Sequence, residues 1–466
     1  MTHKHRVGWP IIVACLAALT IVWSGGMSAT PRTTGTIGAD RLVSVRPLAD
    51  SGSGISPEPD ICPFPGVTLA ANVAQQAGSG AVTTVRSRLG NINEKPLRHV
   101  QDPYPAWSSI AVNAENDMVV MTDENRFAIV EYSRLDNTPP TGPPTVPRRV
   151  IGGGNTRAER ICGTYIDPKT LEIYVTNNDT INWMPVFSRE ARGNAVPDRV
   201  LATPHRTWGI AGDETRQELY MTVQSPDAVI VYRKAASDNE APLRLLVGDA
   251  TELADAHGIA VDVKNDLLVV ANHGHRRFFG GAAVSTLTTP WAEWIAQRTS
   301  LSILPYRLLP GLGVFEPPSI NIYARGASEN TPPLRVIKGP RTQLNWPSHV
   351  AVHEARGEIF VANDASDSVL VFRETDSGDV APIRVIKGRR TTLKNPTGLA
   401  MDATNNEVWV ANMGNFTGIA FPVTATGDVA PIRTIRGGPV NQAGLMIGNP
   451  GAIAYDSKRQ ELLVPN

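Results

Sequence analysis

The sequence predicts an all-β fold made of repeated four-stranded units, and two observations carry this prediction. The stretch Asp379–Asn412 and the apolar run Ser368–Phe372 show the unit, in which short β-branched and aromatic runs are separated by Gly, Pro, Asn and Asp. Close copies of this unit recur about every 50 residues, which is the period of propeller blades. Because one blade cannot bury both of its faces, its neighbours must cover it and the units must close into a ring.

Each half of the unit can be counted separately, and both counts give seven. The first half is aligned on the third residue before a strand-ending Asp, and the second half on the Arg of a Pro-x-Arg motif. The aligned residues are Ile110, Thr164, Ile210, Ile259, Val350, Leu399 and Ile453, and the arginines are Arg98, Arg149, Arg199, Arg244, Arg335, Arg384 and Arg433.

The two ends of the repeat region complement each other. Residues 81–100 form a second half with no first half before it, and residues 451–466 form a first half with nothing after it. We therefore predict a seven-bladed β-propeller of four-stranded antiparallel blades. The ring is expected to close through the N- and C-terminal segments, which share one blade.

The unit reads P-[IL]-R-x-I-x-G, then P-x-G-[IL]-A-x-D, then E-[LVI]-[YWF]-V-A-N, and is best preserved at Pro347–Asn363 and Pro396–Asn412. In this form it resembles the NHL repeat over roughly residues 81–466. The resemblance implies a propeller fold. It leaves the function open, because similar propellers serve as protein-binding platforms, as sugar or lactone hydrolases and as lyases.

The N-terminal region predicts export. Basic residues in Met1–Arg6 precede the apolar run Ile11–Trp23 and then small residues, so residues 1–29 are expected to be a signal peptide, or an N-terminal anchor if uncleaved. Residues 30–66 are rich in Ser, Gly, Pro and Thr and predict a low-complexity tether, and residues 67–466 form the propeller. The expected location is extracytoplasmic: secreted, periplasmic or at the cell surface.

Composition excludes several partners and cofactors. With 44 Lys and Arg against 44 Asp and Glu, the chain is neutral and shows no run of like charge, so neither nucleic acid nor an anionic membrane is an expected partner. A membrane would be contacted only through the N-terminal segment, if that segment is not cleaved. Without C-x-x-C-H or a phosphate-binding glycine loop, no cofactor is predicted. Cys62 and Cys162 are candidates for one disulfide, with two separate thiols as the alternative.

Four histidines are predicted to gather at one face of two adjacent blades. The position two residues before each aligned residue should line the channel mouth, and it holds Ser108, Cys162, Trp208, His257, Ser348, Thr397 and Gly451. His257 and His349 begin inner strands, and His273 and His275 follow the second strand of the His257 blade. Imidazole binds metals and transfers protons near neutral pH, so this cluster is the candidate for chemistry. Alternatively, H-G-H is a polar turn and His349 a core residue.

An insertion at residues 276–318 lies between the second and third strands of the same blade, and therefore over the same face. Within it, Thr289 and Pro290 predict the start of a short helix that carries Trp291 and Trp294 on one side. The segment is apolar enough to need burial, either as a lid over the ring or as a docking patch.

The function that we predict is an exported NHL-like binding module. It takes a protein partner or a small ligand on the face of the insertion, and binding is favoured over catalysis. The alternative is a metal-dependent lyase or lactone hydrolase at the channel mouth, with the four histidines as candidate bases or ligands of a divalent metal. The expected binding residues are His257, His273, His275, His349, Trp208, Trp291 and Trp294.

Overall fold

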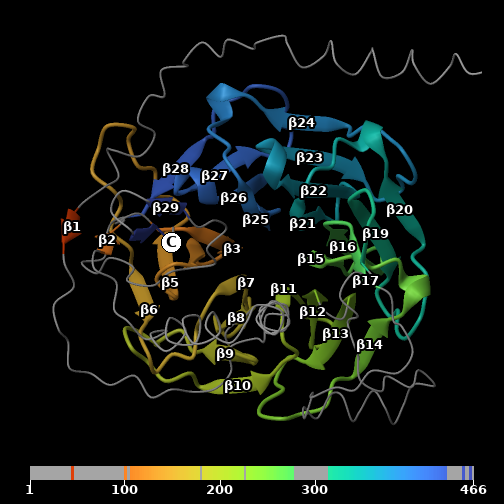
Figure 1. Cartoon of the computed structure of the whole chain (residues 1–466), viewed down its shortest axis with the longest axis horizontal. Helices are drawn as coiled ribbons and strands as arrows, with labels where there is room; N and C mark the ends of the chain where they lie inside the picture. The colour runs from red at the N-terminus through yellow and green to blue at the C-terminus, as the bar shows by residue number, and fades with distance from the viewer. Residues whose placement is uncertain are drawn as a thin grey trace, which may run out of the picture.

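The computed structural model describes residues 105–178, 181–224, 227–277 and 313–437 and four short strands outside these ranges. In this part of the chain, six four-stranded antiparallel sheets surround a common centre as the blades of a β-propeller (Figure 1). The predicted all-β propeller of antiparallel four-stranded blades is therefore confirmed, whereas the predicted number of seven blades is wrong.

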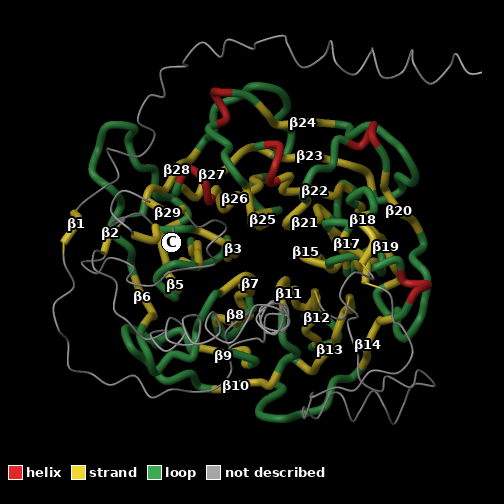
Figure 2. Tube along the Cα trace, in the orientation of Figure 1, coloured by secondary structure: helices red, strands yellow, loops and turns green. Residues whose placement is uncertain are grey.

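Each blade is one continuous segment whose strands pair in chain order from the channel to the rim, as Figure 2 shows. Blade 1 contains β3 (Trp107–Asn113), β4 (Met118–Asp123), β5 (Ala128–Ser133) and β6 (Arg149–Gly152), and blade 2 contains β7 (Ile161–Ile166), β8 (Ile173–Asn177), β9 (Trp183–Phe187) and β10 (Arg199–Ala202). Blade 3 contains β11 (Thr207–Asp213), β12 (Glu218–Gln224), β13 (Asp227–Arg233) and β14 (Arg244–Val247).

The other three blades follow the same order, and blade 4 carries an additional hairpin. Blade 4 contains β15 (Ala256–Asp262), β16 (Leu267–Asn272), β19 (Ser319–Ala324) and β20 (Arg335–Lys338), with the hairpin β17 (His275–Arg277) and β18 (Gly313–Phe315) between β16 and β19. Blade 5 contains β21 (Pro347–His353), β22 (Glu358–Asn363), β23 (Ser368–Arg373) and β24 (Arg384–Lys387). Blade 6 contains β25 (Pro396–Asp402), β26 (Glu407–Asn412), β27 (Thr417–Pro422) and β28 (Arg433–Arg436).

The predicted shared seventh blade is also wrong. The N-terminal strand β2 (His99–Gln101) pairs with β1 (Ser44–Arg46), and the C-terminal strand β29 (Ala454–Asp456) pairs with β30 (Glu461–Leu463). A shared blade would instead pair N-terminal with C-terminal strands. The sequence pattern identifies segments able to form strands, but it does not say how many blades the ring accommodates.

The ring closes directly between blades 6 and 1. Strand β25 packs on β3, and the Thr397 hydroxyl donates a hydrogen bond of 3.1 Å to the Trp107 carbonyl oxygen across this boundary. At every one of the six boundaries, an isolated parallel bridge joins the outer part of one blade to the next, and Thr145 with Gly437 is the bridge at the closure. Blades 6 and 1 are therefore joined in the same way as the other neighbours.

The hydrophobic core consists of six clusters, and each lies between two neighbouring blades. At the closure, Trp107 of blade 1 and Trp409 of blade 6 are buried in one cluster. The Gly of the P-x-G motif lies where neighbouring inner strands approach each other closely. A Cβ on Gly258 would lie 2.4 Å from the His349 Cα atom, so a larger residue would push blades 4 and 5 apart.

The repeated polar residues of the motif serve the fold. Asn412 accepts a hydrogen bond from the Lys394 backbone amide and donates one to the Thr392 carbonyl oxygen, so it caps the entry to its inner strand. Asp402 accepts hydrogen bonds in the following turn from Asn405. Asn and Asp side chains commonly cap backbone groups and stabilise turns in this way.

Among the described residues, no helix is long and apolar enough to cross a membrane. The expected signal peptide and most of the tether lie outside the described residues.

Candidate functional site

A β-bulge at the start of each inner strand shapes the channel mouth. In blade 4 the pairing with β16 shifts between Ala256 and Ile259, and His257 lies in the shifted segment. The same irregularity occurs in the other five blades. Because a bulge re-aims side chains, it directs the residue at the predicted mouth position away from the regular alternation of the strand.

Three of the mouth residues hold neighbouring blades together. The hydroxyl of Ser348 donates to the Pro396 carbonyl oxygen at 2.9 Å, and Ser108 and Thr397 make equivalent bonds to the next blade. In blades 2 and 3, Thr176 and Thr222 of the second strand take over this task. The mouth positions of blades 2 and 3, which are Cys162 and Trp208, are thereby released from it.

Trp208 and His257 belong to a column of four aromatic rings. The ring centroids lie 4.4 Å apart between Trp208 and His257, 3.4 Å apart between His257 and His273, and 4.5 Å apart between His273 and Trp346. The column runs from blade 3 through blade 4 to blade 5. Its end at Trp346 is 50% exposed, whereas His257 is buried.

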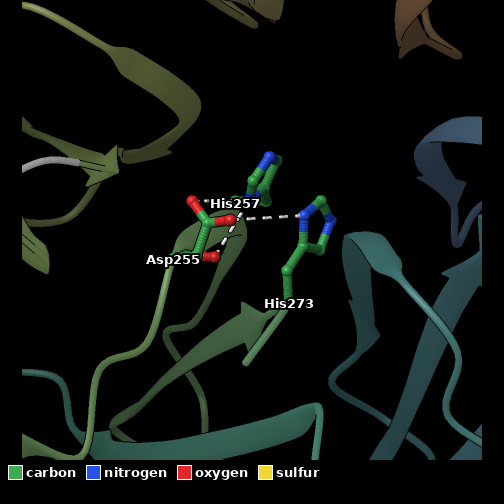
Figure 3. Close-up of side chains that lie close together, drawn as sticks. All are labelled: Asp255, His257 and His273. Carbon is green, nitrogen blue, oxygen red and sulfur yellow. Dashed lines mark hydrogen bonds and ion pairs between the residues drawn. The ribbon is translucent and has the colours of Figure 1, made fainter. Parts of the chain in front are cut away.

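Asp255 lies beside the two imidazoles of this column (Figure 3). It directly precedes β15 and adopts a positive φ of 57°. Its carboxylate oxygens lie 3.9 Å from His257 Nδ1 and 3.8 Å from His273 Nδ1. Its backbone amide donates to Asp227, and its carbonyl oxygen accepts from the His273 amide, so the main chain fixes the position of the carboxylate.

Hydrogen bonds fix the tautomer of His257. Its Nδ1 lies 2.9 Å from the Asp255 carbonyl oxygen, which can only accept, so Nδ1 carries the proton and donates it. Its Nε2 then accepts from the Gln224 amide at 2.7 Å. The Gln224 side chain is oriented in turn by Asn178, whose amide donates to Gln224 Oε1 at 2.9 Å. This chain of bonds links blades 2, 3 and 4.

His273 is the less satisfied member of the pair. Its side chain is 4% exposed, and within the described part of the chain neither ring nitrogen has a hydrogen-bond partner. Burial, with a smaller contribution from His257, lowers the pKa of His273 well below its usual value. The imidazole is therefore neutral at pH 7, and the local charge of the column comes from Asp255.

Asp255, His257 and His273 have the donor types of a metal site, and their ligand atoms all lie within 4.8 Å of one another. The ring orientation does not fit one ion. A bound ion lies close to the plane of each imidazole, about 2.0–2.1 Å from its nitrogen. These two rings are stacked with only 24° between their planes, so the planes meet farther away than such a bond reaches. At least one ring would have to turn before both could bind one metal.

The structure brings together only part of the predicted histidine cluster. His275 stacks on Phe315 of the hairpin at 4.8 Å, and His349 belongs to no group of metal-binding side chains among the described residues. Burial lowers the pKa of His349 to about 4. Trp291, Trp294 and Cys62 lie outside the described residues. Cys162 is buried in β7, where its thiol lies 3.4 Å from the Arg160 carbonyl oxygen.

Sequence reasoning missed Asp255 and Trp346, although the repeat contained the signal. Both occupy the position four residues before the aligned residue, and in both the carbonyl oxygen accepts from the residue after the second strand. This position varies around the ring as much as the mouth position two residues before each aligned residue. It holds Ala106, Arg160, Arg206, Asp255, Trp346 and Asn395.

Comparison with known proteins finds a solved structure with a similar fold but assigns the chain to no family. No family model matches the sequence, and no curated protein matches it. Among solved structures, hydrazine synthase of Kuenenia stuttgartiensis matches with a TM-score of 0.45 and 10% sequence identity over 72% of this chain and 99% of that chain.

Proposed function

We propose that this protein is an NHL-like β-propeller that binds a small organic ligand at the channel mouth. The half-exposed ring of Trp346, held in place by the column behind it, is the observation that carries the proposal. A large exposed aromatic face gains free energy when a flat ligand covers it, and a ring already held in position loses little entropy. The site lies between blade 4, which carries the hairpin β17–β18, and the turn that precedes β21 of blade 5.

The charges of the site favour a planar cation as the ligand. Asp255 contributes a carboxylate, and the adjacent His273 is neutral. The faces of Trp346 and Trp208 attract positive charge, with about 0.5–2 kcal/mol for each well-placed contact. A flat cationic group could therefore lie on Trp346 with its charge directed toward Asp255.

Three small probes with the same ring and different charge test this proposal: benzamidine, benzamide and benzoate. We expect benzamidine to bind about 3–30 times more tightly than benzamide, and benzoate to bind most weakly, when measured by isothermal titration calorimetry. The preference for the cation should disappear in Asp255→Asn, and binding of all three should weaken in Trp346→Ala. Trp183→Ala, in the outer half of blade 2, is the matched control and should bind as the wild type does. Equal affinity for the three probes would refute the cationic ligand.

The second candidate is a metal-dependent lyase or lactone hydrolase, and the buried, unsatisfied His273 favours it. A metal bound there would give the His273 imidazole a partner, but only after one of the two stacked imidazole rings had rotated. We expect metal analysis of the purified, zinc-supplemented protein to find much less than one ion per chain. One equivalent of metal that is lost in both His273→Ala and Asp255→Ala, and kept in His275→Ala, would instead establish the metal site.

A further inference from the structure

At the end of the ring opposite the channel mouth, charged residues follow a rule that repeats from blade to blade. In five of the six blades the residue directly after the third strand occupies an equivalent position, because its backbone amide bonds to the turn between the first two strands of the same blade. In blade 2 the corresponding residue, Ser188, donates its amide to the Asp198 carboxylate instead. In three blades this residue is a cation that reaches the strand-ending Asp of the preceding blade. The pairs are Lys234 with Asp167 at 2.7 Å, Arg325 with Asp213 at 3.0 Å, and Arg134 with Asp402 at 3.6 Å.

Two further boundaries keep the rule by having no charged pair. By position after the third strand and at the end of the preceding inner strand, the corresponding residues are Ser188 with Asn113, and Val423 with His353. A cation therefore occurs at this position where the neighbour offers an Asp, and is absent where it does not. This match is expected because a buried cation without an opposite charge is costly, so the cation and the Asp should occur together.

The boundary between blades 4 and 5 departs from the rule. Here Glu374 takes the place of the cation, and it faces Asp262. Glu374 is 5% exposed and Asp262 is 0% exposed. Within the described residues, Glu374 Oε1 has no hydrogen-bond partner. Two buried carboxylates that face each other cannot both carry a charge without a large cost in free energy.

Asn265 shows what kind of group can resolve this contact. Its side-chain amide donates to Asp262 Oδ2 at 2.8 Å and to Glu374 Oε2 at 3.0 Å. The same nitrogen lies 3.4 Å from the Glu354 carbonyl oxygen, so three acceptors surround it and the NH2 group must point toward the carboxylates. A metal ion between the two carboxylates would face this donor, whereas a proton would not conflict with it.

We infer that the boundary between blades 4 and 5 holds one proton, shared by Asp262 and Glu374, in the place where other boundaries hold a lysine or arginine. The neutral pair packs as a hydrogen-bonded unit, and loss of the proton creates two facing anions. The boundary is therefore a pH-sensitive contact, and it lies apart from the ligand site at the mouth.

The surrounding groups agree with a shared proton. Burial, and then the hydrogen bond and charge of Asp262, raise the pKa of Glu374 to about 8, while Asn265 and Arg335 oppose this shift only in part. Arg335 reaches the Glu374 carbonyl oxygen through Nε at 2.7 Å. The Glu354 carboxylate accepts from the Val263 amide at 3.0 Å and adds negative charge nearby.

The pH dependence follows from the proton count. Below the ordinary pKa of 4.5, Glu374 is protonated in both the folded and the unfolded chain. Between 4.5 and about 8 only the folded chain keeps the proton, so unfolding releases it and stability falls as pH rises. Above about 8 this contribution no longer changes. The stabilisation is thus complete in acid and is lost as pH rises toward the folded pKa.

The decisive experiment compares melting temperatures from pH 5 to pH 10 in wild type, Glu374→Gln and Glu374→Lys. Glutamine imitates the protonated acid, and lysine restores the cation of the other boundaries. Relative to both variants, the wild type should lose about 2–5 °C between pH 6 and pH 9. Glu329→Gln, which removes one exposed carboxylate, is the matched control and should keep the wild-type profile.

Three outcomes would overturn the inference. One is a Glu374→Gln profile that runs parallel to the wild type. Another is a rise of the wild-type melting temperature with calcium or magnesium at pH 9 that Glu374→Gln lacks, since this would place a metal ion between the carboxylates. If Glu374→Gln does not fold, Asp262→Asn takes its place, and an unchanged pH profile in that variant would also refute the shared proton.

Discussion

Replacing Trp409 with alanine is expected to lower the free energy of unfolding by about 3–5 kcal/mol. Trp409 is 0% exposed and fills the core cluster between blades 6 and 1, and its indole nitrogen donates to Glu407 at 3.2 Å. Removal leaves a large cavity, and one fewer hydrogen bond to Glu407, at the boundary that closes the ring. Urea unfolding followed by circular dichroism measures the loss.

Trp346→Ala is the matched control for this variant, because it removes the same side chain from a half-exposed position. It should cost about 1 kcal/mol or less. If the two variants lost equal stability, the boundary between blades 6 and 1 would not be the buried, closed contact that the structure shows.

Replacing Arg134 with methionine should cost about 3–5 kcal/mol through a different cause. The Arg134 side chain is 9% exposed and contacts Asp117 at 3.2 Å, Glu407 at 3.4 Å and Asp402 at 3.6 Å. Methionine fills similar space, so the loss reports mainly Asp402, which is left buried without its cation; Asp117 is 43% exposed and Glu407 keeps Arg433 as a partner. The effect should persist at high salt, because buried pairs are screened weakly.

A double variant separates charge from packing at this position. Adding Asp402→Asn to Arg134→Met removes one of the stranded charges and should recover part of the lost stability. Arg373→Met, on the exposed surface of blade 5, is the control and should change stability by less than about 0.5 kcal/mol. If the double variant were as unstable as the sum of the two single variants, unpaired charge would not be the cause.

Sequence patterns predicted the positions of the strands better than the number of blades in the ring. Each Pro-x-Arg arginine from Arg149 to Arg433 begins an outer strand, and the aligned residues from Ile110 to Leu399 lie in inner strands. These are local properties, since turn residues and alternating apolar residues act within one blade. The number of blades depends on how neighbours pack, and matching half-units at the chain ends do not contain that information.

The candidate site was predicted only in part for a similar reason. His257 and His273 were placed together because a blade fixes where its own strands begin and end. Asp255 and Trp346 were missed because they lie in the turn before the strand, where the motif shows no repeated residue. His275 lies after the second strand of the same blade, where the pairing of β17 with β18 brings its ring against Phe315.

The directly closed ring also bears on circular permutation. A Cβ atom on Gly437 would lie 3.3 Å from the side chain of Pro105, so the first and last residues of the six-bladed segment are neighbours. Every blade is a continuous segment, and no strand is exchanged across the boundary between blades 6 and 1. The blade at which the chain begins is therefore not dictated by the ring, although the blades must keep their cyclic order. A permuted chain that joins Gly437 to Pro105 through a short linker and begins between blades 3 and 4 is expected to form the same ring.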